Sequence, residues 1–278
     1  MSVFLERVKQ ALSSWWSSRP RRVGLALSGG AVRGIAHIGV LQVLEEAGVP
    51  IHCIAGVSAG AAVGAAYAAG LSPERLEEIA LDLRWTHISR VRAPRLGLLD
   101  ISPLEEYFNE LVGHELTFAD LRIPFAAVAA DIVRGNLVVL REGPVAPAVR
   151  ASCSVPGIFT PARLDGRLLV DGGVLNNLPV SVARELGAEY VIAVDLLPKG
   201  RLHREPRHLI EMLSATIYTL MRATHFEASL ADCLIQPLVV RMSLIDFADA
   251  PALLKAGREA AYAALPQLQR DLGLAPRR

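Results

Sequence analysis

The chain has 278 residues, of which 52% are hydrophobic and 21% charged, and its formal net charge is +1. This length is sufficient for one large domain with a substantial core. The near balance of charge excludes the strongly basic or acidic chains typical of nucleic-acid binding, so we expect no nucleic acid partner.

Residues 1–22 stand apart from the rest of the chain, with apolar side chains at roughly helical spacing that include Trp15 and Trp16. Two interpretations stay open: a helix docked on the body, or an amphipathic helix in the plane of a membrane, with the tryptophans at the interface. No charged stretch followed by a continuous apolar run indicates a secretory signal. We therefore expect a cytoplasmic protein, with residues 1–22 as the candidate peripheral contact with the inner membrane face.

Strand-like and helix-like segments alternate after residue 22. Strands are predicted at 22–28, 51–55, 125–130, 137–140, 168–170, 190–195 and 234–239. Helices are predicted from the glycine turn to Ala47, from Ser58 onward, from Pro73 behind the N-cap Ser72, and over about 207–230 and 250–272. This order predicts an α/β layered domain with a largely parallel sheet. No internal repeat or low-complexity linker divides residues 23–278, which we assign to one domain.

The stretch IAGVSAGAAVGAAYAAG (Ile54–Gly70) carries no charge and raises the question of a membrane span. With its two uncharged neighbours it reaches about 19 residues, which meets the usual length criterion. However, alanine and glycine contribute little transfer energy, and the stretch begins inside a predicted strand. A strand followed by a closely packed helix is the better interpretation.

Within that stretch, Gly56-Val57-Ser58-Ala59-Gly60 forms a G-x-S-x-G motif between the predicted strand and helix. The pattern alone is weak evidence, but this context is typical of a nucleophile elbow, where a serine sits on a sharp turn and glycines prevent collisions. Amides at the helix N-terminus would stabilise negative charge beside the serine. A plain helix N-cap is the alternative, and we favour Ser58 as nucleophile.

A second glycine turn, Ser28-Gly29-Gly30-Ala31-Val32-Arg33-Gly34, also joins a strand to a helix. As a dinucleotide fingerprint it lacks the middle glycine, and no acidic residue ends the next strand. As a phosphate-binding P-loop it lacks the final Gly-Lys-Ser/Thr. The remaining interpretation is an oxyanion hole, with consecutive amides of Gly30 and Ala31 directed at one oxygen and Arg33 bracing the loop.

The sequence Asp171-Gly172-Gly173 follows a strand-like run. An isolated Asp-Gly-Gly is a common turn, but a carboxylate at a strand end within reach of Ser58 would serve as its general base. No histidine occupies the late loop that the Ser–Asp–His order of an α/β-hydrolase requires. A Ser58–His225 pair stays open, ranked below Ser58–Asp171.

Three further features of the sequence are weaker indications. Cys53, Cys153 and Cys233 are far apart without metal-site spacing, which predicts buried thiols in a reducing compartment. Arginine clusters occur at 19–22, 90–95 and 201–207; solvated loops explain each one, although together they could face anionic headgroups. The segment 84–104 is basic and rich in turn residues, and we expect it to be a flexible cover over the site.

Together these residues resemble the patatin-like phospholipases, in particular the bacterial single-domain branch related to neuropathy target esterase. In that family a glycine-rich loop ending in Arg/Lys-Gly forms the oxyanion hole, G-x-S-x-G carries the nucleophile and D-G-[GA] carries the second member of a catalytic dyad. The matching segments are Gly29–Gly34, Gly56–Gly60 and Asp171–Gly173, in the same order. The run 151–180 is similar to the family's block around the aspartate. One departure is Ala31, where many members have glycine.

The resemblance implies a three-layer α/β/α patatin-like fold, no metal, no cofactor and hydrolysis of lipid acyl esters. It assigns Ser58 and Asp171 to the catalytic dyad, the amides of Gly29, Gly30 and Ala31 to the oxyanion hole, and motif-supporting roles to Arg33, Gly34, Gly56, Gly60, Gly172 and Gly173. Phospholipid or lysophospholipid is the expected substrate. A thioesterase acting on soluble acyl substrates, and a patatin-fold regulator or adaptor with incidental esterase activity, are the alternatives.

Overall fold

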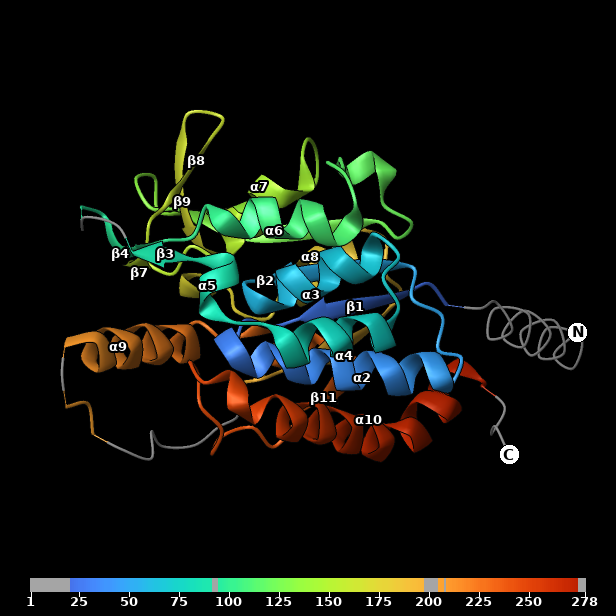
Figure 1. Cartoon of the computed structure of the whole chain (residues 1–278). Coiled ribbons are helices and arrows are strands. Elements are labelled where there is room, and N and C mark those ends of the chain that lie inside the picture. Colours follow the sequence, from blue (N-terminus) through green and yellow to red (C-terminus); the bar gives the residue numbers. More distant parts are fainter. Residues whose placement is uncertain (1–20, 92–94, 198–204, 208, 275–278) are drawn as a thin grey trace, which may run out of the picture.

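The computed structural model describes residues 21–91, 95–197, 205–207 and 209–274; the predictions made for residues 1–20 lie outside them. Within this described part, the core is an eight-stranded sheet (Figure 1). Its strand order is β11-β10-β1-β2-β5-β9-β8, with β6 pairing with β5 off this path. In that order the strands span Cys233–Ile235, Tyr190–Val194, Val23–Leu27, Cys53–Val57, Phe125–Asp131, Arg167–Asp171 and Ala162–Leu164, and β6 spans Asn136–Leu140.

The sheet is mixed but largely parallel, as predicted. Strands β11, β10, β1, β2 and β5 run parallel to one another, whereas β6 and β9 are antiparallel to β5, and β8 is antiparallel to β9. The carboxyl ends of the parallel strands therefore meet at one edge. Since β9 runs the other way, Asp171, at its last position, reaches the register of Ala129 on β5.

Helices cover both faces of the sheet, which gives the expected α/β/α layers. On β1, Leu25 and Leu27 belong to a core shared with α2 (Ile35–Glu46), α3 (Ala59–Ala68), α4 (Pro73–Asp82) and α10 (Ala250–Leu272). Ala26 and its small neighbours instead pack against α8 (Val180–Glu185) on the other face. Side chains alternate between faces along a strand, so this split follows from the sequence of β1 itself.

Helices α2 and α10 cross at two glycines. A Cβ atom on Gly39 would collide with the backbone carbonyl of Leu254, and one on Gly257 would collide with that of Ala36. The absence of side chains at both positions lets the two backbones approach closely. This contact fixes the outer helical layer behind the β1–α2 loop, which is one component of the site.

A second, three-stranded sheet lies at the left of Figure 1, with order β3-β4-β7. Its strands are β3 (Arg90–Val91), β4 (Gly97–Asp100) and β7 (Gly157–Phe159). The remaining α-helices of the described residues are α5 (Trp85–Ile88), α6 (Pro103–Val112), α7 (Val145–Ser152) and α9 (Leu209–Ala223). Of these, α9 packs against β7, whereas α7 packs against β5, β8 and β9 of the main sheet. The segment 84–104 thus contains α5, β3, β4 and the start of α6. The flexibility expected of this segment stays a prediction, as does the domain boundary at residues 22 and 23.

Several predicted boundaries shift. Strand β2 begins two residues later than expected and runs directly into Ser58, so Ile54–Gly70 divides into β2, the serine turn and α3. Strand β11 ends at Ile235, two residues before Pro237, which has no N–H to donate to a strand. No helix in the described part of the chain combines the length and apolar character that crossing a bilayer requires.

Candidate active site

Ser58 lies in a sharp turn between β2 and α3 with φ 53° and ψ −124°. A positive φ is rare for a residue with a side chain, and such strain persists where the surroundings enforce it. Both motif glycines provide that enforcement. A Cβ atom on Gly56 would collide with the backbone of Gly60 and Ala61, and one on Gly60 with the carbonyls of Leu27 and Ser28. The spacing G-x-S-x-G therefore reflects close backbone packing around the serine.

Ser152, a buried residue outside the three motifs, fixes the backbone of this turn. The amide of Ser58 donates a hydrogen bond of 2.8 Å to Oγ of Ser152, at the end of α7. That hydroxyl in turn donates to the carbonyl of Val128 on β5 at 2.6 Å. Ser152 is fully buried, so both bonds are shielded from water and hold the elbow against the sheet.

Asp171 is brought to Ser58 by the register of the sheet. Val57 pairs with Val128, so Ser58 follows at the level of Ala129, which is the partner of Asp171. The carboxyl group is fully buried, and its Oδ1 accepts a 2.8 Å hydrogen bond from the amide of Gly173. Its Oδ2 has no hydrogen-bond partner among the described residues. This oxygen is therefore available to accept a proton.

The surroundings of Asp171 raise its pKa to about 6, chiefly because burial penalises the charged carboxylate. The nearby hydroxyl of Ser58 and the amide of Gly173 lower the pKa and partly offset this effect. A carboxylate with this pKa is ionised at neutral pH and is still more basic than an ordinary aspartate. Both properties are required of a general base.

The thiol of Cys153 lies beside the same two side chains. Burial raises its pKa above the ordinary value, the charge of Asp171 raises it further, and the Ser58 hydroxyl lowers it. The thiol therefore stays protonated at neutral pH, which makes Ser58 the better candidate nucleophile. All three cysteines are free and buried, as predicted.

The glycine loop after β1 lies directly against the serine turn. A Cβ atom on Gly29 would stand 3.2 Å from that of Ser58. The amide of Gly29 donates to the carbonyl of Asn177 at 3.2 Å, and the Asn177 side chain donates to the Gly29 carbonyl at 3.3 Å. For the amides of Gly30 and Ala31, no acceptor is found among the described residues. These two amides, rather than that of Gly29, are available for an oxyanion.

Arg33 does not point to an external ligand in this structure. Its guanidinium group is buried and donates hydrogen bonds of 2.8–3.1 Å to the carbonyls of Val240 and Met242. The amide of Val32 bonds the same segment at the carbonyl of Leu244. Gly34 allows the loop to contact Ala59, because a Cβ atom there would collide with the Ala59 methyl group. Arg33 therefore ties the glycine loop to the segment before α10.

Gly172 and Gly173 have comparable packing roles after the aspartate. A Cβ atom on Gly172 would collide with the carbonyl of Val128, and one on Gly173 with the Asn177 side chain and with Met221 of α9. Asp171 itself donates its amide to the carbonyl of Ser154 at 2.9 Å. Asp171 is thus held on both sides, by the loop after α7 and by the glycine turn.

The alternative pair, Ser58 and His225, is not formed in the structure, because His225 pairs with Asp195 instead. Nε2 of this ring lies 3.0 Å from Oδ2 of Asp195, a buried carboxylate that also accepts from the Gln236 side chain at 2.9 Å. No hydrogen bond joins His225 to Ser58 among the described residues. Nor do those residues include a group of three or more His, Cys, Asp or Glu side chains arranged to hold a metal ion.

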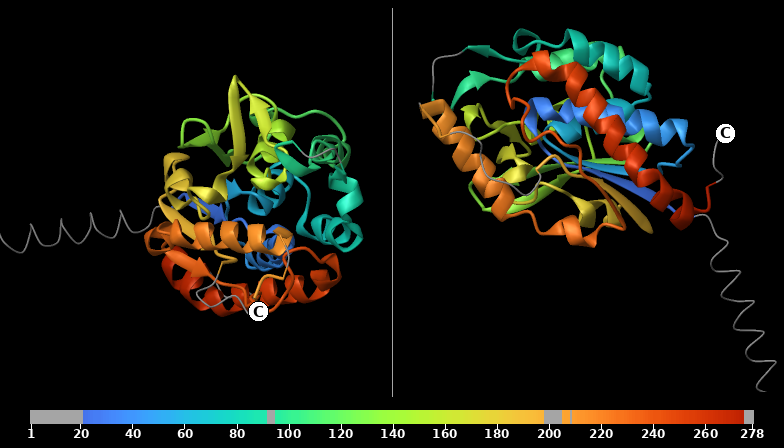
Figure 2. Two further views of the ribbon diagram at one scale, coloured as in Figure 1. Left: turned by 90° about the vertical axis from the view of Figure 1, so that its left-hand side faces the viewer. Right: turned by 90° about the horizontal axis from the view of Figure 1, so that it is seen from below.

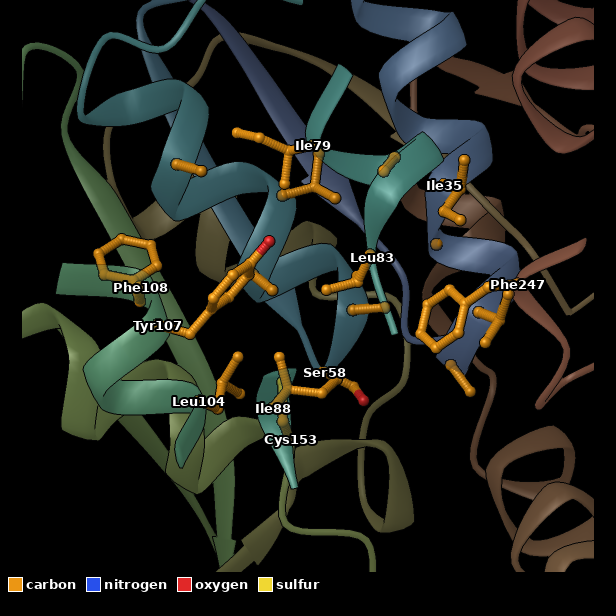
Figure 3. A pocket seen from close by; sticks show the side chains of 18 of the residues that line it. Ile35, Ser58, Ile79, Leu83, Ile88, Leu104, Tyr107, Phe108, Cys153 and Phe247 are labelled. Carbon is orange, nitrogen blue, oxygen red and sulfur yellow. The ribbon is translucent and has the colours of Figure 1, made fainter. Parts of the chain in front are cut away.

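An apolar cavity of about 180 Å³ adjoins Ser58 (Figure 3). The labelled side chains in Figure 3 come from several helices and turn toward one space. Apart from Ser58, Cys153, Tyr107 and Trp85, the lining is aliphatic, small or phenylalanine. The segment 84–104 contributes Trp85, Ile88, Ile101 and Leu104, so it forms part of the cavity wall. A wall of this composition suits a hydrocarbon chain.

Sequence reasoning singled out Ser58, Asp171 and the three glycine motifs, and the structure brings these together. It did not assign Ser152, Cys153, Ser154 or Asn177 to the site, although they contact the pair or the loop directly. These residues occur in the run ASCSVPG and in NNLP, where no spacing rule distinguishes them from ordinary small or turn residues.

Comparisons with known proteins show the family of this chain. A family model described as patatin-like phospholipase matches residues 25–184. An uncharacterised NTE family protein of Mycobacterium tuberculosis is 42% identical over 186 residues, covering 65% of this chain and 50% of that protein. A second one is 36% identical over 286 residues, covering 91% and 48%. Patatin-like phospholipase domain-containing protein 6 of Mus musculus is 37% identical over 185 residues, covering 63% and 13%.

Solved structures of low identity share the fold. VipD from Legionella pneumophila has a TM-score of 0.58 at 15% identity, covering 90% of this chain and 67% of VipD. The type III effector protein ExoU has a TM-score of 0.51 at 16% identity, covering 91% and 54%. The chain spans about half the length of the mycobacterial relatives that it matches.

Proposed function

The chain belongs to the patatin-like phospholipase family, and we propose that it is a serine acyl hydrolase that cleaves acyl esters of phospholipids or lysophospholipids. Family membership itself implies an ester hydrolase. The finer proposal concerns which residues act and on what. It assigns the nucleophile to Ser58, the general base to Asp171 and the oxyanion hole to the amides of Gly30 and Ala31.

One observation carries this proposal: a strained serine adjoins an apolar cavity and lies beside a buried carboxylate, one oxygen of which has no hydrogen-bond partner among the described residues. A structural N-cap serine would need neither the positive φ nor the cavity. In α3 the side chain of Ser58 makes no capping hydrogen bond, so its hydroxyl is left for chemistry.

In the first half-reaction, Oγ of Ser58 attacks the acyl carbonyl carbon while its proton passes to Oδ2 of Asp171. The carbonyl oxygen becomes an oxyanion that accepts hydrogen bonds from the amides of Gly30 and Ala31. When the intermediate collapses, the ester C–O bond breaks, and the leaving alkoxide takes the proton from Asp171. The products of this step are the alcohol and an acyl-Ser58 ester.

In the second half-reaction, Asp171 accepts a proton from water, which attacks the acyl carbon of the Ser58 ester. The same two amides stabilise the second oxyanion. Collapse breaks the bond to Oγ of Ser58, and the proton returns from Asp171 to that oxygen. The fatty acid leaves, and both side chains regain their starting state without any redox step.

The cavity supports a lipid acyl group as the part of the substrate that is recognised. Burying each methylene contributes about 0.8 kcal/mol, so a long chain in this cavity gains several kcal/mol of binding free energy. The walls near Ser58 offer little polar chemistry by which a headgroup could be recognised. We therefore expect acyl length to be discriminated more strongly than headgroup.

The test is hydrolysis of a p-nitrophenyl acyl ester series, followed by phospholipid and lysophospholipid substrates, with wild type, Ser58→Ala and Asp171→Asn. Circular dichroism and a melting curve establish that each variant is folded. The matched control is Asp165→Asn, because Asp165 is also followed by glycine but is exposed in the β8–β9 turn. We expect kcat to fall at least 1,000-fold in the dyad variants, as for loss of a catalytic unit, and to be unchanged in the control.

Two results would contradict this assignment. Turnover by a well-folded Ser58→Ala variant at the wild-type rate would show that Ser58 is not the nucleophile. Hydrolysis of acyl thioesters with a much higher kcat/KM than of any oxygen ester would shift the function to a thioesterase at the same site.

A further inference from the structure

The outward face of α9 carries no charged side chain. Leu209, Met212 and Leu220 are 69%, 52% and 44% exposed. With Thr216, Thr219 and Ala223 they form a stripe about 100° wide on an ideal helix. The charged residues of α9, Glu211 and Arg222, lie outside this stripe on that projection. A solvent-exposed helix normally presents charge on its outer face, so this face is unusual for one that meets only water.

The two threonines in the stripe do not restore its polarity. The hydroxyl of Thr216 donates to the carbonyl of Met212 at 2.9 Å, and that of Thr219 donates to the carbonyl of Ala215 at 2.8 Å. Because both hydroxyls are bonded within the helix, they need no water to satisfy them. The stripe can therefore leave water at little cost in lost hydrogen bonds.

A second exposed apolar element lies at the same end of the molecule. In the β3–β4 hairpin, Val91 and Leu96 are 86% and 59% exposed. Strand β4 pairs with β7, and α9 reaches β7 through Leu213, whose side chain lies 3.8 Å from the position of a Cβ atom on Gly157. Figures 1 and 2 both place α9 and this hairpin at one end of the molecule. Phe159 of β7 also lines the cavity beside Ser58.

The charges in the adjoining sequence favour an anionic partner. Residues 84–96, which include the hairpin, contain four arginines and no acidic residue. Residues 198–207, which precede α9, contain four basic residues and one acidic residue. The whole chain has a formal net charge of only +1, so these two segments are far more basic than the chain as a whole. Apolar side chains flanked by arginines match an anionic bilayer, with the apolar groups inserted and the arginines at phosphate.

Arg22, from the remaining arginine cluster, lies at the other end of the main sheet. It precedes β1, whereas the loop that contacts Ser58 follows the last residue of β1, Leu27. Five strand residues separate these points by about 17 Å. Arg22 therefore lies toward the amino end of the sheet, whereas β3 and α9 lie toward its carboxyl end (Figure 1).

We propose that the outward stripe of α9, together with Val91 and Leu96 on the two strands of the β3–β4 hairpin, forms the surface that docks this protein on an anionic phospholipid bilayer, near the Ser58 cavity. The proposal deepens the proposed function, because it states how a lipid substrate in a membrane reaches the serine. The occupant is a lipid surface rather than a second copy of the chain, because the surrounding arginines would repel their own copies.

The test is cosedimentation of the full chain, as the Ser58→Ala variant, with vesicles of phosphatidylcholine containing phosphatidylglycerol. In this background Met212→Glu, Leu220→Glu and Val91→Glu should each weaken binding roughly tenfold, because each replaces an inserting group by an anion. The matched control, Ala263→Glu, adds the same charge to the exposed side of α10 and should bind as the parent does. Vesicles of phosphatidylcholine alone should bind less protein than the anionic ones.

The same substitutions in the active chain separate this proposal from the catalytic one. We expect unchanged turnover of a short soluble ester and reduced turnover of vesicle phospholipid. Binding unchanged by all three glutamates, or lost equally in the Ala263→Glu control, would overturn the docking surface and leave the dyad untouched. A dimer in lipid-free solution that all three glutamates break would also overturn it, in favour of a second copy.

Discussion

The turn that carries Ser58 and the wall of the adjoining cavity differ in how their positions are fixed. At the turn, a positive φ, two glycines without room for a Cβ atom and a bond to a buried serine determine the backbone. The wall is made of side chains from several separate segments, most of which are apolar. A reacting oxygen has to be placed within a fraction of an ångström, whereas a hydrocarbon chain needs only volume.

This difference predicts a sharp response to change at the dyad and a graded response along the wall. The largest effects should come from the protonation of Asp171. The carboxyl must be ionised to accept a proton, and its pKa in the folded protein is about 6. We therefore expect kcat/KM for a soluble ester to fall about tenfold for each pH unit below 6 and to reach a plateau above it.

The raised pKa of Asp171 also predicts how stability depends on pH, and the direction is opposite to that of activity. Its folded pKa of about 6 lies above the unfolded value of about 3.9, so burial favours the protonated form. Its contribution to the free energy of unfolding is therefore complete below pH 4 and is lost as the pH rises through 6. The loss is up to roughly 3 kcal/mol, from about two pKa units.

Melting curves of wild type and Asp171→Asn between pH 4 and 7.5 measure this effect. The difference in Tm should move in favour of the asparagine variant as pH rises, while its activity stays low at every pH. A constant difference would indicate that Asp171 keeps an ordinary pKa. Activity that follows pH in the same way in both proteins would show that another group is the base.

A smaller effect is expected at Ser152, which holds the backbone of the turn. Removing its hydroxyl in Ser152→Ala leaves the buried amide of Ser58 without an acceptor, at a cost of about 1–3 kcal/mol. Because the turn then shifts and displaces the nucleophile, kcat should fall 10- to 100-fold with little change in KM. Steady-state kinetics on a soluble ester measures both constants.

Ser154→Ala is the matched control for this change. Ser154 is buried two residues after Ser152, but among the described residues its hydroxyl bonds only the Arg150 carbonyl, at 2.9 Å, and its contact with Asp171 uses the backbone carbonyl. Equal losses of kcat in both variants would mean that the loop tolerates no change, and that Ser152 has no specific role.

The contrast between turn and wall also explains what the sequence could predict. The turn can be recognised in the sequence because its geometry requires glycines within two residues of Ser58 and of Asp171. Such local spacing is the same in the sequence as in the structure. Strands β1 and β5 and helices α2 and α10 were likewise predicted close to their bounds, since glycine, proline or charged residues stand at the ends of each run.

The short elements around the site, and the contacts that support it, were not predictable residue by residue. Strands β7 and β8 have only three residues each, too few to show alternation, and α7 contains Pro147 in its first turn. The contacts of Ser152 and Asn177 span 94 and 148 residues along the chain. Such pairings depend on the register of the sheet, which cannot be read from a single sequence. The Gly29 amide shows the same limit, because its engagement with Asn177 is a tertiary contact.

The smallest and most graded effect should appear on α3, whose inner face runs from Ser58 into the wall. Ala62 and Ala66 line the cavity one and two turns after Ser58, at about 6 and 12 Å along the helix axis. A leucine at either position would fill part of the cavity. Ala62→Leu should therefore exclude all but short acyl chains, whereas Ala66→Leu should spare medium chains and reject long ones.

Rates across the p-nitrophenyl ester series measure this preference, with Ala62→Ser and Ala66→Ser as controls that add little volume. We expect the optimum to shift by several carbons and kcat for the shortest ester to change less than threefold, because neither side chain supports the Ser58 turn; the bond from Ala62 to the Ser58 carbonyl uses the backbone amide. An optimum shifted equally by both leucines would place the acyl chain elsewhere than along α3. A large loss on the shortest ester would mean that the wall constrains the serine, and that the two regions are not separable.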